Sequence, residues 1–124
     1  MQKIDFIKMH GLGNDFVIID NRIENIDISK NLIHQLSDRK SGAGCDQLIT
    51  INSSNESDID ASIEIFNPSG DRAEACGNGT RCVAKLLFDE SQKKKLNILS
   101  DAGILHAIKD RKSTRLNSSH TSTS

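Results

Sequence analysis

The sequence predicts an α+β fold in which a mostly antiparallel sheet wraps around one central helix. Short segments that alternate apolar and polar residues recur along the chain, and clusters of turn residues separate them. One longer stretch, residues 79–90, is apolar on most sides, which is typical of a buried helix. The 124 residues are enough for one small domain with a modest core.

The first half of the chain predicts two strands and a helix. Strands are expected over Lys3–Met9 and Asp15–Asp20, with the turn HGLGN between them. Ser29 can cap a helix that runs from Lys30 to Arg39, and the glycines of KSGAG end it. The apolar stripe of this helix consists of Leu32, Ile33 and Leu36.

The second half predicts a helix and further strands around it. The sequence NPSGD, Asn67–Asp71, has the composition of a turn. The buried helix is expected over Gly79–Glu90. Four strands are expected at residues 45–51, 59–66, 96–100 and 104–108.

The polar end of the chain, residues 110–124, does not continue this pattern. It is rich in Ser and Thr and has no apolar periodicity, as in a disordered tail. Residues 110–120 also match the translation of a common DNA-sequencing adapter. We therefore expect a domain over residues 1–109, truncated at its end, and a non-native or disordered tail over residues 110–124.

Composition narrows the classes of function. The 16 basic and 17 acidic residues nearly cancel, and Trp and Tyr are absent, so neither nucleic acid nor an anionic membrane is an expected partner. The sequence contains no run of about 18 apolar residues, which a membrane-spanning helix would require. The three cysteines have no CxxC spacing, so we expect no disulfide framework and no metal site in a cytoplasmic protein.

Four glycine-rich polar segments interrupt the strands: HGLGNDF, SGAGCDQ, FNPSGD and ACGNGTRC. The first lacks the third glycine of a dinucleotide-binding loop, and none has the Gly-Lys-Ser/Thr of a phosphate loop. Each does contain or adjoin an uncharged amide that can both donate and accept hydrogen bonds. These amides, Asn14, Gln47, Asn67 and Asn78, suit a zwitterionic small molecule.

Cys76 is the candidate for chemistry, because it precedes a Gly-Asn-Gly turn and the buried helix. The N–H groups of Gly77 and its neighbours stabilise an anion at such a helix start, so they can lower the pKa of a thiol or hold a carboxylate. Cys82 is expected in the core and Cys45 is expected to be structural. The thiolate can act as a nucleophile or as a Brønsted base.

Taken together, HGLGNDF, GCDQL, FNPSG and ACGNGTRC resemble the diaminopimelate epimerase family in order and spacing, from Met1 to about Lys109. The resemblance implies an N-terminal half-domain of an enzyme that interconverts LL- and meso-diaminopimelate with two cysteines, without cofactor or metal. It implies a homodimer for the complete enzyme. It assigns Cys76 as one catalytic cysteine and substrate-binding positions to Asn14, Gln47, Asn67, Gly77 and Asn78.

Three alternatives remain open. Within the superfamily, the chain could belong to a proline-racemase-like or phenazine-biosynthesis-like isomerase. A cysteine hydrolase or transferase would need a histidine near Cys76, and His10, His34 and His106 show no motif that links them to it. A non-catalytic binding module would keep the amides without the chemistry.

Overall fold

In the part of the chain that the structure describes, one sheet of seven strands forms the frame, and its strands lie side by side in chain order. The computed structural model describes residues 4–11, 13–23, 26–73, 77–109 and 114–118. The strands are β1 (Ile7–Gly11), β2 (Asn14–Asp20), β3 (Gln47–Asn52), β4 (Ala61–Phe66), β5 (Lys95–Ser100), β6 (Gly103–Lys109) and β7 (Thr114–Ser118).

Two helices connect the parallel neighbours in this sheet. Helix α1 (Lys30–Ser37) leads from β2 to β3, and helix α2 (Gly77–Glu90) leads from β4 to β5. All other neighbouring strands are antiparallel. A parallel pair requires a long crossover connection, whereas a short turn can join an antiparallel pair. The prediction of a mostly antiparallel sheet around a helix is therefore confirmed.

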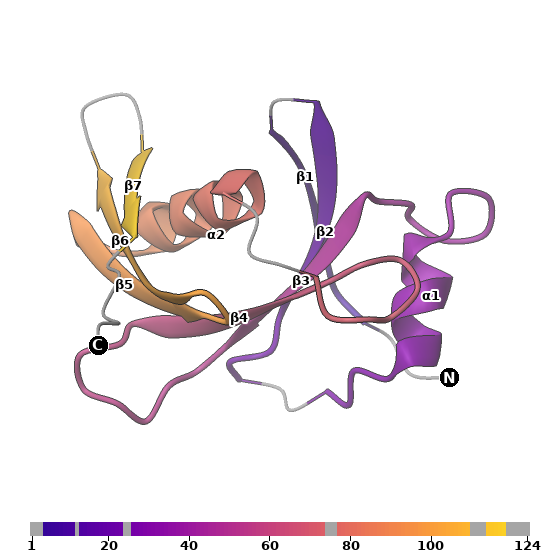
Figure 1. Ribbon diagram of the computed structural model, residues 1–124, viewed down its shortest axis with the longest axis horizontal. Coiled ribbons are helices and arrows are strands. Elements are labelled where there is room, and N and C mark those ends of the chain that lie inside the picture. The colour runs from indigo at the N-terminus through magenta and orange to yellow at the C-terminus, as the bar shows by residue number, and fades with distance from the viewer. Residues whose placement is uncertain (1–3, 12, 24–25, 74–76, 110–113, 119–124) are drawn as a thin grey trace.

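Helix α2 lies in the curl of the sheet, with β1 and β2 on one side and β5 to β7 on the other (Figure 1). Its apolar residues pack against side chains from five strands, and this cluster is the main core. Phe16, Ile18 and Ile49 are fully buried in it. The remaining buried members are Ile51, Ala61, Ile63, Ile65, Ala73, Cys82, Val83, Ala84, Leu87, Phe88, Leu96, Ile98 and Ala107.

Helix α1 covers the opposite face of the sheet. Its Ile33 packs with Val17 and Ile19 of β2 and with Leu48 of β3. Because β2 contributes Phe16 and Ile18 to one face and Val17 and Ile19 to the other, it is buried on both sides. Its uninterrupted apolar sequence follows from this position.

Several element boundaries differ from the sequence-based expectation. The first strand begins and ends later than Lys3–Met9, because its pairing with β2 extends to Gly11 opposite Asn14. Helix α1 ends at Ser37 rather than Arg39, since the Asp38 carboxylate accepts a hydrogen bond from the N–H of Lys40 and ends the helix. Helix α2 begins at Gly77, two residues before the expected start.

The end of the chain contributes one more strand. Residues 114–118 form β7, which pairs antiparallel with β6. Without β7, the outer edge of β6 would leave N–H and C=O groups that an extended segment can pair with. This pairing does not depend on the origin of residues 110–124, so their non-native origin stays a prediction.

Two nearby glycines of α2 meet different surroundings. A Cβ at Gly79 would lie 2.7 Å from Ile49 Cδ1 and 3.2 Å from Phe16 Cε1, so only glycine allows the helix to approach β2 and β3 this closely. A Cβ at Gly77 would meet no atom within 4 Å among the described residues outside its own helix. Gly79 thus serves packing, while no described residue outside α2 fills the space beside Gly77.

We therefore expect Gly79→Ala to lower the free energy of unfolding by about 1–3 kcal/mol, because the added methyl group overpacks the core. Gly77→Ala is the matched control, and we expect it to be neutral or to stabilise the helix by less than about 1 kcal/mol. Urea denaturation of the three chains measures both changes. Equal stabilities of the two variants would contradict the close-packing argument.

Candidate functional site

The amides predicted to bind a ligand are brought to one end of the sheet. Asn14 opens β2 and Gln47 opens β3, and both side chains are half-buried. In the parallel register Gln47 lies opposite Phe16, two residues after Asn14. Phe66, the last residue of β4, pairs with Leu48, so exposed Asn67 follows at the same end as Gln47.

The start of α2 meets this end of the sheet through the hairpin that joins β1 and β2. A Cβ at Gly11 would lie 3.9 Å from the carbonyl oxygen of Asn78 and 3.4 Å from Cys82 Sγ. The Cys82 thiol lies 4.0 Å from the carbonyl oxygen of His10, to which it donates a weak hydrogen bond. Asn78 is half-buried and Gly77 is exposed. Four chain segments that sequence reasoning singled out thus converge.

Cys76 lies outside the described residues. Helix α2 begins with the next residue, Gly77. The first N–H groups of any helix have no partner within the helix, and they create a positive potential at its start. The described part of α2 therefore supplies a positive potential next to Cys76. This is the potential on which the prediction of an activated Cys76 thiol depends.

The turn after β4 is anchored to α1. The N–H of Asn67 donates to the carbonyl oxygen of Asp71 at 2.9 Å, and the N–H of Gly70 donates to that of Asn67 at 2.8 Å. Lys30 forms an ion pair with Asp71 at 3.0 Å. These contacts confirm the turn expected over Asn67–Asp71.

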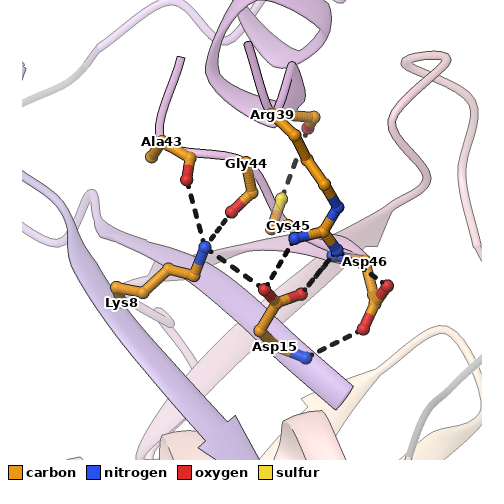
Figure 2. Close-up of polar contacts among 8 residues, drawn as sticks. Lys8, Asp15, Arg39, Ala43, Gly44, Cys45 and Asp46 are labelled. Carbon is orange, nitrogen blue, oxygen red and sulfur yellow. Dashed lines mark hydrogen bonds and ion pairs between the residues drawn. The ribbon is translucent and has the colours of Figure 1, made fainter.

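Sequence reasoning missed a group of charged residues directly behind these amides (Figure 2). Asp15 and Asp46 are the immediate chain neighbours of Asn14 and Gln47. Arg39 donates from Nη1 and Nη2 to the two oxygens of Asp15, both at 3.0 Å, and from Nη2 to Asp46 Oδ1 at 3.0 Å. We call Lys8, Asp15, Arg39 and Asp46 the charged cluster.

The two carboxylates of the charged cluster also bind each other's backbone. The N–H of Asp15 donates to Asp46 Oδ2 at 2.9 Å, and the N–H of Asp46 donates to Asp15 Oδ1 at 2.8 Å. Lys8 Nζ lies 3.3 Å from Asp15 Oδ2 and donates to the carbonyl oxygens of Ala43 and Gly44. The signal in the sequence is an aspartate beside each amide, in GNDF and GCDQ, with an arginine upstream of the second.

Contacts within the charged cluster strongly shift the pKa values of Asp15 and Arg39. The hydrogen bonds from Arg39 hold the pKa of Asp15 far below its usual range, and Lys8 adds to this effect. Asp15 in turn raises the pKa of Arg39. Since the Asp15 side chain is only 14% exposed, solvent screens its charge less than it screens an ordinary surface ion pair.

Cys82 lies in the main core, as the sequence predicts, and Cys45 is buried in the smaller cluster against α1. Cys45 is 2% exposed, and its thiol donates to Ser37 Oγ at 3.4 Å, which ties the glycine-rich loop to the end of α1. Cys82 is 7% exposed and packs against β1.

A concave region, about 400 Å³ in volume, lies where β4 and β5 diverge. Arg72 crosses it, paired with Glu64 and Asp101, each at 2.9 Å. The charged side chains in this region therefore pair with one another and link neighbouring parts of the sheet.

Within the described residues, no group of three His, Cys, Asp or Glu side chains could hold a metal ion. The same part of the chain contains no helix of the length and hydrophobicity that a membrane span requires.

The fold is shared with solved structures described as phenazine biosynthesis proteins of the PhzF family, racemases and epimerases. A phenazine biosynthesis protein of the PhzF family from Bacillus anthracis superimposes with a TM-score of 0.68 at 20% identity, over 94% of this chain and 40% of that protein. A probable proline racemase from Agrobacterium radiobacter gives a TM-score of 0.66 at 15% identity, over 92% of this chain and 41% of that protein.

Sequence comparison identifies the family. The sequence model of diaminopimelate epimerase matches residues 6–121, so the chain belongs to the diaminopimelate epimerase family. The diaminopimelate epimerase of Pelagibacter ubique is 52% identical over 102 residues, which are 82% of this chain and 36% of that protein. The chain thus spans about a third of the length of the curated relatives it matches.

The charged cluster generates a pH prediction. An Asp with a lowered pKa in the folded state stabilises the fold above its ordinary pKa of 3.8, and this stabilisation is lost as the pH falls below that value. We expect Asp15→Asn to lower the free energy of unfolding by about 1 kcal/mol at pH 7. Denaturation midpoints measured from pH 7 to pH 2 should show this difference shrinking below pH 3.8. A difference that is constant across this range would contradict the assignment.

Proposed function

We propose that this chain is the N-terminal half of an enzyme that interconverts LL- and meso-diaminopimelate, on the route to lysine and peptidoglycan precursors. Cys76 supplies one of its two acid/base thiols. One observation carries the proposal: in a chain of this family, the start of α2 meets the end of the sheet where Asn14, Gln47 and Asn67 lie.

The proposed chemistry needs only proton transfer. The Cys76 thiolate takes the proton from the α-carbon, so that the C–H bond breaks, an S–H bond forms and the electron pair stays on carbon. A second thiol, in the part of the enzyme outside this chain, donates its proton to the opposite face. The configuration inverts and the two thiols exchange protonation states. In the reverse direction each thiol takes the other role.

Substrate binding is assigned to groups that surround this position. Among the described residues outside α2, nothing blocks the space beside Gly77, so a substrate carboxylate can approach the N–H groups at the start of α2 there. The side chains of Asn14, Gln47, Asn67 and Asn78 can donate to carboxylate oxygens and accept from ammonium groups. This combination suits an amino acid that carries both charges.

The remaining features of the proposal follow from the family resemblance. The reaction uses neither pyridoxal phosphate nor a metal ion, and the complete enzyme works as a homodimer in the cytoplasm. Each of these is a prediction for the whole enzyme, of which this chain is one part.

The test of the proposed activity uses residues 1–109 fused to the C-terminal remainder of the Pelagibacter ubique relative. With LL-diaminopimelate in deuterated water, the fusion should incorporate deuterium at one α-carbon as meso-diaminopimelate forms. A cysteine hydrolase would instead accumulate an acyl-enzyme with ester substrates and leave the α-proton in place. A binding module would do neither, so either result would reject the proposed reaction.

Cys76→Ala in this fusion should lower α-proton exchange by about 10³-fold, because the base on one face is lost. Cys82→Ala is the matched control: it should retain turnover and lower the free energy of unfolding by about 1–2 kcal/mol, since it leaves a small cavity beside β1. Turnover and thermal midpoints of both variants give the comparison. An active Cys76→Ala enzyme would reject Cys76 as the base.

The 124-residue chain by itself should not epimerise diaminopimelate. Inversion needs groups on both faces of the α-carbon, and removal of one member of such a pair costs nearly all of the activity. The measurement compares the chain alone with an equimolar mixture of the chain and a separately produced C-terminal half, under reducing conditions. Measurable conversion by the chain alone, at a rate near that of the active mixture, would refute the two-base mechanism.

A further inference from the structure

The charged cluster lies directly behind two of the proposed substrate-binding amides. Arg39 is the side chain that binds both of its carboxylates, in addition to the hydrogen bonds that Asp15 and Asp46 accept from each other's backbone N–H groups. Asn14 and Gln47 open neighbouring strands, and the residue that adjoins each of them is an aspartate held by the same guanidinium group. A planar guanidinium fixes both distance and orientation of the carboxylates that it binds, which a single ammonium group does not.

The loop that carries Arg39 is shaped to present this side chain. Gly44 has a φ of +76°, and a Cβ there would lie 2.9 Å from Arg39 Cγ and 3.0 Å from its Cα. Only glycine therefore allows Arg39 to lie against the loop. The N–H of Gly44 donates to the carbonyl oxygen of Leu36, and that of Cys45 to that of Ser37, so the loop is anchored to α1.

Neutralising the charge of Asp15 does not by itself require Arg39. Lys8 already forms an ion pair with Asp15 and is held in place by two carbonyl oxygens. Arg39 adds a rigid bridge between Asp15 and Asp46, while its own side chain is 56% exposed and contributes little to the core. Its bridging geometry is thus the property that distinguishes it from Lys8.

We propose that Arg39 is a positioning residue for substrate binding: by bridging Asp15 and Asp46, it fixes the separation and orientation of Asn14 and Gln47. This inference rests on the proposed function, because it takes the two amides to be substrate ligands. Arg39 itself does not contact the substrate.

The chain offers a matched control at the other end of β2. Arg22 also bridges two carboxylates: it binds Asp20 at 2.8 and 2.6 Å and Glu90 at 2.6 Å. Asp20 ends β2 and Glu90 ends α2, so this bridge lies at the ends of both elements opposite the proposed site. Arg39→Lys and Arg22→Lys therefore remove the same type of interaction, one behind the amides and one distant from them.

The first measurement needs no ligand. In ¹⁵N-labelled 124-residue chains, Arg39→Lys should shift or broaden the backbone and side-chain amide signals of Asn14 and Gln47, and Arg22→Lys should leave them unchanged. Signals of Asn14 and Gln47 that stay unchanged in Arg39→Lys would overturn the inference. If Arg39→Lys does not fold, Asp46→Asn replaces it, since it weakens the same bridge with an isosteric side chain, and the same signals decide.

The second measurement titrates the same chains with meso-diaminopimelate. Arg39→Lys should raise the Kd by about tenfold relative to the parent chain, because the amides no longer hold their relative position, and Arg22→Lys should not change it. If Arg39→Lys changes the Asn14 and Gln47 signals but binds meso-diaminopimelate with the Kd of the parent chain, Arg39 is merely structural and the positioning role is overturned. If meso-diaminopimelate does not change the Asn14 and Gln47 signals of the parent chain, the proposed site itself is overturned, and this inference with it.

Discussion

The close approach of α2 to the sheet is the constraint on which the rest of the structure depends. At Gly79 the helix backbone comes so near to Phe16 and Ile49 that a single methyl group would collide with them. This contact brings the first turn of α2 to the ends of β2 and β3, where the proposed substrate-binding side chains lie. The remainder of the helix fills the curl of the sheet with side chains such as Val83 and Phe88. Packing and the location of the site therefore have one common origin.

Much of the fold could be predicted because burial imposes simple periodicities on this chain. Ala61, Ile63 and Ile65 alternate with polar residues, and β4 is buried on the face that this alternation indicates. The all-round apolar character of α2 correctly predicted a helix enclosed by strands. Boundaries were less predictable, because pairing partners and side-chain caps determine them. Asp38, for example, ends α1 through hydrogen bonds that no periodicity reveals.

The candidate site could be predicted in part. Glycine-rich segments with amides gave Asn14, Gln47 and Asn67, and their meeting at one end of the sheet follows from strand register. The charged cluster could not be predicted, because Asp15, Arg39 and Asp46 are separated in sequence and charged residues are usually solvated. Only the parallel pairing of β2 with β3 brings the two aspartates close enough for one guanidinium to bind both.

The agreement between strand order and chain order has a consequence for how this protein is made. Each strand from β2 onward pairs with the strand synthesised just before it, across a short connection in the antiparallel pairs and across α1 or α2 in the two parallel pairs. Contacts that are local in sequence form quickly, and domains begin to fold while the ribosome is still extending the chain. The sheet can therefore grow during translation one strand at a time, from β1 onward. Helix α2 emerges after β1 to β4 and before β5 and β6, which then enclose it from the other side.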